Sequence, residues 1–410
     1  MKKAILKYIF IIPIFIFGCD SMLGIKEPNI AIEFPELPQT DLKSIEFIQL
    51  LPVWTGFNQP EDVLIGFDDL VYIADTKNNR VLQLDVNGKI LGSINIPEPT
   101  SIAQDRRLDL LVIGKYDSTF GAIKLKLSCL YRIKLVKNNH QLSNSTAQPV
   151  IIHPGYVLGR NLKTSDTSVS FSGVAVLSDN QYFISRRGNE NLSITQAGGP
   201  DNNVLWFDKN DKLVTPLTAY LNPLGSGKAS SFGITNIATY ATPPQRSNVD
   251  ERKHFLITLN GETNFRVQGM RYSSGREDVA FMPDPQLESI DTTIGKRFLY
   301  DSDPTDGLLK SGFQNPEEII YTADRGYLVV VDSGTDSLYL FTSSGVEGIL
   351  PPTYSTERKN ILVSFGGFGS GNKQFNNPMG IAYFQSDRIF YVADTGNNRI
   401  VRFKLSTDFK

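Results

Sequence analysis

Apolar residues occur along this chain in short runs, and polar clusters such as Asn-Gly and Ser-Ser-Gly interrupt these runs repeatedly. Short apolar runs bounded by turn-forming residues predict β-strands, whereas an amphipathic helix needs a longer stretch with a period of 3.6 residues. The pattern therefore predicts an all-β protein that is made of many short strands joined by turns.

One pattern is repeated along the chain. YIADTKNNRVLQL at 72–84 returns as YVADTGNNRIVRF at 391–403, and a third copy of the longer unit around it lies at 314–345. Each copy reads as strand, turn, strand, tight turn and strand, and three weaker copies bring the total to six units, spaced by roughly forty residues where compact. A sheet of this size has two apolar faces, so we expect the units to stack on one another.

The repeated unit resembles the NHL repeat family of six-bladed β-propellers. The resemblance rests on Pro378, Gly380 and the run 391–399, with counterparts at Pro60 and 72–80. It implies one six-bladed propeller over residues 44–410. A seven-bladed ring is the alternative, since the long connections leave room for another unit.

Both ends of the repeat region suggest how the ring closes. The last unit ends at Leu405 with its third strand, and a strand-like segment at 44–54 precedes the first unit. We expect this N-terminal segment to supply the missing outer strand of the last blade, because closure removes open sheet edges.

The tight turn of the repeat has a structural explanation. Its aspartate can accept hydrogen bonds from the backbone amides of the following turn, and its asparagines tolerate left-handed backbone conformations. Its arginine can pair with an acidic or carbonyl group of a neighbouring blade. The residues concerned are Asp75, Asn78, Asn79, Arg80, Asp394, Asn397, Asn398 and Arg399.

The N-terminus predicts export. Residues 1–18 combine a basic start with an apolar run that is short for a membrane span, and Gly18 precedes Cys19. This arrangement resembles the bacterial lipobox, which implies lipidation of Cys19, an extended tether at 19–43 and a lipid-anchored protein of the cell envelope. An ordinary signal peptide followed by a free cysteine is the alternative. Cys129 is then expected to be a small buried residue on a strand.

Charge and motif content argue against several classes of function. A formal charge of −2 gives no general attraction to nucleic acid. The sequence contains no G-x-S-x-G, H-E-x-x-H or P-loop motif. Some propeller lyases that resemble this fold hold zinc with histidines, but His140, His153 and His254 are scattered along the chain, which argues against a common metal.

The residues just before each inner strand are expected to meet at the channel mouth. Carboxylates and amides there could hold calcium, as in hydrolytic six-bladed propellers with Glu, Asn and Asp at this place. The alternative is that these carboxylates are solvated or paired with Arg106, Arg186 or Arg187. The candidate ligands are Glu61, Asp62, Asn236, Glu317 and Glu318, and the other residues expected at the mouth are Thr100, Ser101, Ser172 and Met379.

Long insertions at 117–127, 136–170, 188–201 and 273–312 are expected to form loops, and loops on rigid scaffolds often carry binding surfaces. Arg186 and Arg187 are candidates for a loop contact. The sequence therefore favours a non-catalytic binding or scaffold lipoprotein that engages an envelope protein or a glycan, without nucleic acid and without a cofactor. A calcium-dependent hydrolase or lyase with its site in the channel is the competing hypothesis.

Overall fold

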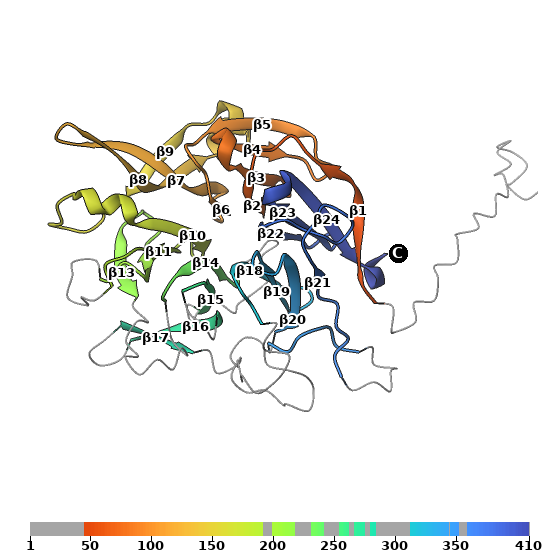
Figure 1. The fold of residues 1–410 in the computed structure, drawn as a ribbon. Coiled ribbons are helices and arrows are strands. Elements are labelled where there is room, and N and C mark those ends of the chain that lie inside the picture. The colour runs from red at the N-terminus through yellow and green to blue at the C-terminus, as the bar shows by residue number, and fades with distance from the viewer. Residues whose placement is uncertain are drawn as a thin grey trace, which may run out of the picture. The chain divides into compact units, whose positions relative to one another are not determined.

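A computed structural model describes residues 45–191, 199–217, 231–241, 254–261, 266–274, 279–283, 312–343, 345–351 and 359–409. For 271–274 and 279–283 it describes the backbone alone. All these residues belong to one compact unit, Asp41–Lys410. Within them, six four-stranded antiparallel sheets surround a central axis as the blades of a propeller (Figure 1).

The strands of each blade run outward from the axis in the order of the sheet. Blade 1 contains β2 (Pro60–Ile65), β3 (Val71–Asp75), β4 (Arg80–Leu84) and β5 (Ile90–Asn95). Blade 2 contains β6 (Ser101–Gln104), β7 (Asp109–Phe120), β8 (Ile123–Lys134) and β9 (Ala147–Ile152). Blade 3 contains β10 (Ser170–Val176), β11 (Tyr182–Arg187), β12 (Asn203–Phe207) and β13 (Leu213–Leu217).

The remaining blades follow the same plan. Blade 4 contains β14 (Ile234–Thr239), β15 (His254–Leu259), β16 (Val267–Ser274) and β17 (Val279–Pro283). Blade 5 contains β18 (Pro316–Thr322), β19 (Tyr327–Asp332), β20 (Ser337–Thr342) and β21 (Phe365–Gly366). Blade 6 contains β22 (Pro378–Phe384), β23 (Ile389–Asp394), β24 (Arg399–Leu405) and β1 (Phe47–Trp54). Short 3-10 turns are η3 (Thr76–Asn78), η4 (Val136–Asn138), η5 (Leu142–Asn144), η6 (Thr164–Ser168), η9 (Thr395–Asn397) and η10 (Ser406–Asp408).

The hydrophobic core lies between the blades. Each of six apolar clusters among the described residues joins two adjacent blades, and together the clusters follow the whole ring. Between blades 2 and 3, for example, Leu111 and Leu130 belong to the same cluster as Tyr182 and Leu205. This arrangement confirms that the units bury their faces against one another, as the repeat predicts. Cys129 is fully buried on β8 in the same way, as expected.

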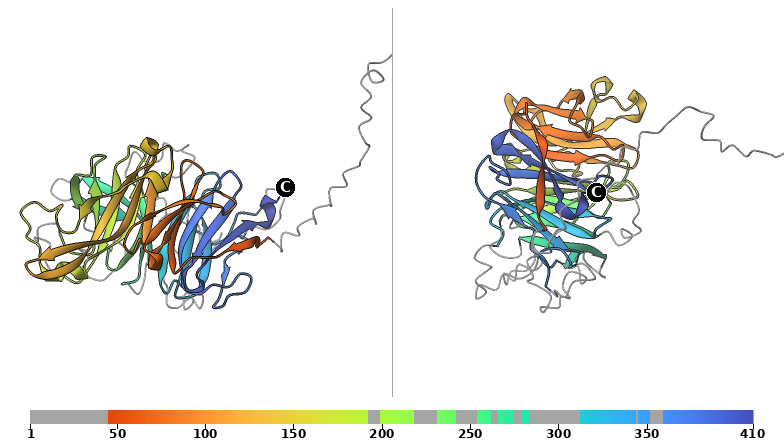
Figure 2. Two further views of the ribbon diagram at one scale, coloured as in Figure 1. Left: turned by 90° about the horizontal axis from the view of Figure 1, so that it is seen from above. Right: turned by 90° about the vertical axis from the view of Figure 1, so that its right-hand side faces the viewer.

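Strand β1 closes the ring and confirms the predicted role of the N-terminal segment. It pairs antiparallel with β24, from Phe47 opposite Leu405 to Trp54 opposite Ile400, and it lies beside the last strands in both views of Figure 2. Phe47 is 1% exposed and packs edge-on against Phe390, with 5.3 Å between ring centroids. The Arg402 guanidinium lies 4.8 Å from the centre of the Trp54 ring. Both ends of β1 are therefore anchored in the core.

The aspartate of the repeated turn holds the hairpin to the chain that precedes the blade. In blade 6, Asp394 accepts a hydrogen bond from the Asn376 amide at 2.8 Å, and its other oxygen accepts from Asn397 and from Arg399 Nε. Asp75 has the equivalent three partners in blade 1. The expected bonds from the following turn amides are thus replaced by bonds from an upstream amide and from two side chains. The expected carbonyl partners of the arginine are present, since Arg399 also donates to Ser370 O and Gln374 O.

The second asparagine of the turn joins neighbouring blades. Asn79 and Asn398 have φ values of 52° and 55°, the left-handed conformation expected for this turn. The Asn398 side-chain oxygen accepts from the Gln59 amide at 2.7 Å, and Asn79 accepts from the Glu98 amide at 2.9 Å. Each bond reaches the segment that leads into the next blade.

Replacement of Asn398 tests this turn. We expect Asn398→Ala to lower the free energy of unfolding by about 1–3 kcal/mol, because it leaves the Gln59 amide without its acceptor and forces a Cβ-bearing residue without a polar group into the left-handed region. Asn398→Gly should restore the backbone part of the loss and leave only the hydrogen-bond part. Urea denaturation of the three proteins measures the difference. Equal stability of the Ala and wild-type proteins would contradict this role.

Three of the four expected insertions contribute strands to blades. The segment 273–312 does so through β17 (Val279–Pro283), the outer strand of blade 4. Residues 117–127 belong mostly to the long β7–β8 hairpin, whose paired strands run to Phe120 opposite Ile123. The segment 136–170 contributes β9, the outer strand of blade 2. A two-stranded ribbon can continue beyond a sheet wherever both strands keep alternating side chains, so length beyond the usual unit does not require a loop.

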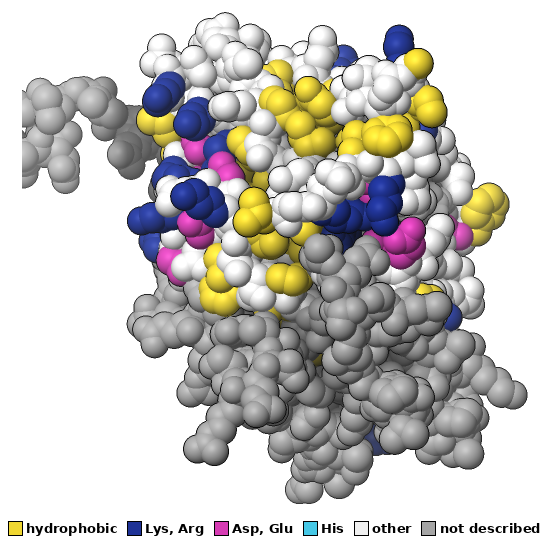
Figure 3. Space-filling model, turned by 90° about the vertical axis from the view of Figure 1, so that its left-hand side faces the viewer, with side chains coloured by type: hydrophobic (Ala, Val, Ile, Leu, Met, Phe, Trp, Pro, Cys, Tyr) yellow, Lys and Arg dark blue, Asp and Glu magenta, His cyan; other side chains and the backbone are white. Residues whose placement is uncertain are grey.

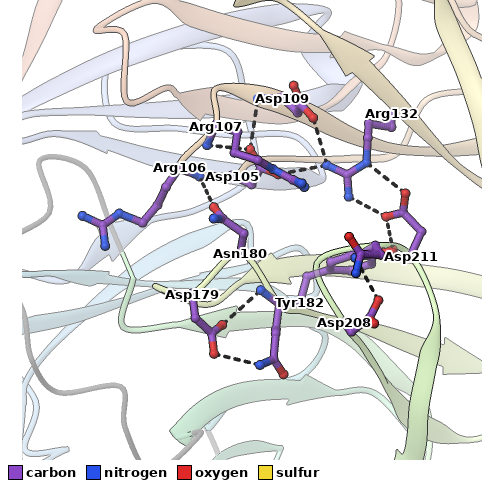
Figure 4. Close-up of polar contacts among 12 residues, drawn as sticks. Asp105, Arg106, Arg107, Asp109, Arg132, Asp179, Asn180, Tyr182, Asp208 and Asp211 are labelled. Atoms are coloured by element: carbon purple, nitrogen blue, oxygen red, sulfur yellow. Dashed lines mark hydrogen bonds and ion pairs between the residues drawn. The ribbon is translucent and has the colours of Figure 1, made fainter.

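An ion-pair network joins blades 2 and 3 (Figure 4). Arg132 on β8 is 4% exposed and donates from Nη1 to Asp105 at 2.9 Å and to Asp109 at 3.3 Å. Its Nε donates to Asp211 of blade 3 at 3.1 Å, and Tyr182 donates to the same carboxylate at 2.8 Å. The single guanidinium thus neutralises carboxylates from both blades, as a buried charge requires.

Candidate functional site

The inner strands bring six side chains to one end of the channel. A cavity of about 200 Å³ lies there, and every blade contributes to its lining. The residues that occupy the same position in successive blades are Glu61, Thr100, Ser172, Thr235, Glu317 and Met379. The predicted meeting of mouth residues is therefore confirmed for Glu61, Thr100, Ser172, Asn236, Glu317 and Met379, which all line this cavity.

Backbone bulges turn these side chains toward the channel. The pairing register shifts at this position in five of the six inner strands, as between Pro60 and Asp62 in blade 1 and between Pro316 and Glu318 in blade 5. A bulge inserts one unpaired residue and redirects its side chain. Glu61 and Glu317 are such inserted residues, which explains why they face the cavity while their neighbours face the next blade.

The carboxyl groups on the acidic side of the cavity, Glu61 and Glu317, have raised pKa values. Burial raises the pKa of Glu61, Lys77 opposes this shift and the charge of Glu317 adds to it, and the resulting pKa is about 7. Burial also raises the pKa of Glu317, although its carboxylate accepts hydrogen bonds from Asn315 and Ser333. These two groups flank blade 6, where Met379 provides an apolar lining.

The other side of the cavity is basic, a feature that the sequence pattern does not predict. Lys115 on β7 and Arg187 on β11 line the cavity from blades 2 and 3. Lys115 Nζ donates to Ser128 and Arg187 Nε donates to Ser170, both at 3.3 Å. Burial lowers the pKa of Lys115, and the charge of Glu98 opposes that shift. Because Lys115 lies in the middle of a long strand, no motif in the sequence marks it.

Asp62 and Glu318 lie away from this cavity and hold adjacent blades together. Asp62 is 3% exposed and accepts a hydrogen bond from the Ile102 amide of blade 2 at 2.6 Å. Glu318 accepts from the Ile381 amide of blade 6 at 2.6 Å and lines a second, mostly apolar cavity. At the same position in blade 6, a Cβ on Gly380 would lie 2.7 Å from the Asp62 Cα, so only glycine fits between these strands.

The carboxyl groups of Asp62 and Glu318 interact electrostatically. Burial raises the pKa of Asp62 to about 7, and the charge of Glu61 adds to the shift against the bond from Ile102. Burial and then the charge of Asp62 raise the pKa of Glu318 well above its usual range. The folded protein therefore favours a protonated form of this pair at neutral pH.

Stability is expected to depend on pH through Asp62. Because the pKa is raised in the folded state, the native protein binds more protons than the unfolded chain between about pH 4 and 7, so stability falls as pH rises through this window. Asp62→Asn keeps the acceptor for Ile102 and removes the titration, so we expect it to unfold at higher temperature than wild type at about pH 8 and to converge with wild type toward about pH 4. The control Asp69→Asn, at an exposed turn position, should track wild type throughout. A pH-independent difference for Asp62→Asn would contradict the raised pKa.

The five predicted calcium ligands are divided between three environments. Glu61, Asn236 and Glu317 line the mouth cavity, Asp62 is buried in the wall, and Glu318 lines the second cavity. Within the described ranges, no group of three or more His, Cys, Asp or Glu side chains is placed to hold a metal ion. The ring geometry separates these residues because adjacent positions on a strand point in opposite directions.

His153 and Arg186 have structural surroundings. His153 is buried between Tyr156 and Phe171. Burial lowers its pKa to about 2, because it disfavours the protonated, charged form of the ring. Arg186 is 2% exposed and donates to the carbonyl oxygens of Gly199 and Pro200 and to the Tyr156 hydroxyl. Arg186 is therefore not available for a contact with a partner. Arg187, its neighbour on β11, is exposed and faces the cavity.

The surface carries both signs of charge. On the face drawn in Figure 3, lysine and arginine side chains lie beside aspartate and glutamate side chains, and hydrophobic groups are scattered between them. Mixed charge of this kind gives no extended attraction to a polyanion. Among the described residues, no helix has the length and apolar character needed to span a bilayer.

Comparisons with known proteins agree with this architecture. Residues 375–403, which contain β22, β23 and most of β24, match the family model of the NHL repeat. The fold resembles that of an auxiliary nutrient binding protein from Bacteroides thetaiotaomicron, with a TM-score of 0.51 and 11% identity over 90% of this chain and 74% of that chain. No curated protein sequence gives a significant match.

Two further solved structures are similar over most of the chain. An auxiliary nutrient binding protein from Bacteroides ovatus has a TM-score of 0.49 and 10% identity, and the match covers 88% of this chain and 77% of that chain. A streptogramin B lyase has a TM-score of 0.47 and 12% identity, and the match covers 89% of this chain and 100% of that chain.

Proposed function

Because the chain is an NHL-repeat β-propeller with six blades, we propose that it is a non-catalytic binding protein of the bacterial cell envelope. The channel-mouth cavity is its ligand site, and the ligand is a polar group that is free or carried by a protein or glycan partner. One observation carries this proposal: all six blades contribute side chains to one cavity, and charged, hydroxyl and amide groups converge there. Ligand sites commonly combine an enclosed shape with a few convergent polar groups.

An unsatisfied hydroxyl supports a ligand in this cavity. Among the residues that the structure describes, Thr100 Oγ1 is buried and has no hydrogen-bond partner, and Thr100 lines the cavity. A buried polar group without a partner costs about 1–3 kcal/mol, and a bound ligand can remove that cost. The binding role named for the Bacteroides thetaiotaomicron neighbour agrees with this proposal, although at 11% identity the likeness extends to the fold alone.

A filled cavity tests the site. We expect Ser172→Phe to place an aromatic ring in the cavity and to remove the ligand found by native mass spectrometry on protein purified from native membranes. The matched control Thr119→Phe introduces the same ring at an exposed position of the β7–β8 hairpin and should retain the ligand. If the Ser172 variant folds, by its thermal melt, and retains the ligand, the ligand site lies elsewhere.

The anchor is a separate part of the proposal. Lipidation of Cys19 would hold the propeller at a membrane surface through the segment 19–43, because two acyl chains give stable anchoring. We expect Cys19→Ala to abolish fatty-acid labelling and to leave the protein uncleaved or released in soluble form. Normal labelling and processing of this variant would reject the lipoprotein hypothesis.

A calcium-dependent enzyme is the second candidate. The raised pKa of Glu61 favours it, because a carboxyl group that titrates near pH 7 suits general acid–base catalysis. Calcium bound by Glu61, Asn236 and Glu317 would raise the melting temperature, by about 2.7 kcal/mol of added stability at a hundred times Kd. Glu61→Gln with Glu317→Gln should abolish that response. A response lost in this double variant would favour the enzyme over the binding protein.

A further inference from the structure

Five charged side chains line the mouth cavity, and one of them, Glu98 in the segment that leads into blade 2, is already paired with Lys126 at 2.7 Å. The other four are divided between two sides of the cavity. Glu61 of blade 1 and Glu317 of blade 5 flank blade 6, whereas Lys115 and Arg187 come from the adjacent blades 2 and 3. In a ring of six blades, blade 2 lies across the axis from blade 5 and blade 3 lies across it from blade 6. The cavity therefore has an acidic side and a basic side that face each other.

The opposite charges do not neutralise each other by direct contact. Among the described residues, no ion pair within 4.0 Å joins Lys115 or Arg187 to Glu61 or Glu317. Lys115 and Arg187 each donate to one serine hydroxyl at 3.3 Å, so most of their N–H groups remain available. Like charges are adjacent on each side, and a counter-charge from a ligand would relieve their repulsion.

Building on the mouth cavity as the ligand site, we propose that the ligand is a zwitterion, either a free amino acid or a short peptide. Its carboxylate binds Lys115 and Arg187, and its ammonium group binds Glu61 and Glu317. A carboxylate accepts charge-assisted hydrogen bonds from both cations, and arginine offers a planar pair of donors that matches it.

The remaining lining fits the rest of such a ligand. Met379, Phe171 and Ile113 provide apolar contact, while Thr100 offers a hydroxyl group. A volume of about 200 Å³ restricts the occupant to a small molecule or to the end of a longer one. A neutral sugar would leave all four charged groups without a counter-charge, and a site with unpaired polar groups rejects such a ligand strongly.

Protonation gives the proposal an independent signature. An ammonium group beside Glu61 favours the ionised carboxylate, so binding should lower the raised pKa of this group and release a proton near pH 6–7. A neutral ligand that binds by hydrogen bonds has no such reason to release a proton. Calorimetry in two buffers of different ionisation enthalpy measures the number of protons released.

The test is isothermal titration calorimetry on the purified chain with four probes. L-leucine and Gly-Leu carry both charges, leucinamide carries only the ammonium group, and 4-methylpentanoate carries only the carboxylate. We expect one of the two zwitterions to bind at least tenfold more tightly than either single-charge probe, with release of a proton near pH 6.5. Glucose and N-acetylglucosamine serve as neutral probes.

Substitutions locate the two charged groups of the ligand. Arg187→Gln should weaken the bound zwitterion at least tenfold and leave leucinamide unaffected, whereas Glu317→Gln should weaken the zwitterion and leave 4-methylpentanoate unaffected. Lys209→Gln, which removes an exposed positive charge from the β12–β13 turn of the same blade as Arg187, should change nothing. Thermal melts of each variant exclude loss of folding as the cause.

The outcomes separate this inference from the proposed function. Tight binding of a neutral sugar that Ser172→Phe abolishes would overturn the zwitterion and keep the cavity as a ligand site. Zwitterion binding that Arg187→Gln and Glu317→Gln both leave unchanged would also overturn the inference. If no probe binds and Ser172→Phe retains the native ligand, both the inference and the cavity as ligand site are wrong.

Discussion

Deletion of residues 45–54 is expected to leave the last blade open and to destabilise the whole propeller. The deletion removes the buried side chains of Phe47 and Trp54, and truncation of a single buried aromatic residue already costs about 3–5 kcal/mol. It also exposes the backbone edge of β24 along the register from Ile400 to Leu405, which favours aggregation. We expect a large drop in the midpoint of urea unfolding, and aggregation at concentrations where the wild type does not aggregate.

Point variants distinguish the loss of buried side chains from the exposure of the β24 edge. Phe47→Ala keeps the β1–β24 pairing and should cost about 3–5 kcal/mol without aggregation. Leu51→Ser alters the same strand at a position that is 77% exposed and should stay within about 0.5 kcal/mol of wild type. A deletion protein that melts within a degree or two of the wild type would show that β1 does not close the ring.

Replacement of Arg132 is expected to be the most damaging single substitution in the described part of blade 2. Arg132→Met keeps much of the side-chain volume. It leaves Asp109 and Asp211 without their buried cation, because their carboxylates accept hydrogen bonds from this guanidinium at 3.3 and 3.1 Å. Removal of one partner from a buried ion pair typically costs about 3–5 kcal/mol, because the other charge remains buried and uncompensated. Urea unfolding measures the loss.

Arg107 provides the matched control for this effect. It donates to the same Asp105 carboxylate at 2.7 Å, but its side chain is 42% exposed. Exposed ion pairs contribute about 0–1 kcal/mol, so Arg107→Met should be nearly neutral. If the two variants lose equal stability, burial is not the reason that the Arg132 network matters.

The fold was predictable because its signals are local and repeated. The pattern around 72–84 and 391–403 specifies strands and turns by short-range preferences, and six copies of it leave few arrangements other than a ring. Closure by β1 was also predictable. The last unit ends at Leu405 without its outer strand, and one strand-like segment precedes the first unit.

The channel residues were predictable only in part. Glu61 and Glu317 could be placed at the mouth because they precede strands at a repeated position, and the structure brings both to one cavity. Their neighbours Asp62 and Glu318 were placed with them, but alternation along a strand turns consecutive side chains to opposite sides. The register shift that decides which residue faces the channel has no sequence signal of its own.

The basic side and the interblade network required the structure. Lys115 reaches the cavity from a strand that was expected to lead into an insertion, and its position depends on how far the β7–β8 hairpin is paired. Arg132 and Asp211 are separated by 79 positions in the sequence, so no local pattern predicts their contact. Arg186 appears on the sequence beside Arg187 as an equal candidate, yet strand alternation buries one and exposes the other.

The pairing of β1 with β24 also sets an order of events during synthesis. Strand β1 is synthesised long before β24 and must wait for it, because Phe47 and Leu405 are opposite one another. Until the last blade is complete, the apolar side chains of β1 have no partner, and five blades must assemble beside an open gap. Such distant contacts slow folding, because the entropy of a long loop is lost before any contact is gained. The nascent chain of this protein should therefore reach its final stability in one late step, after β24 has been released from the ribosome.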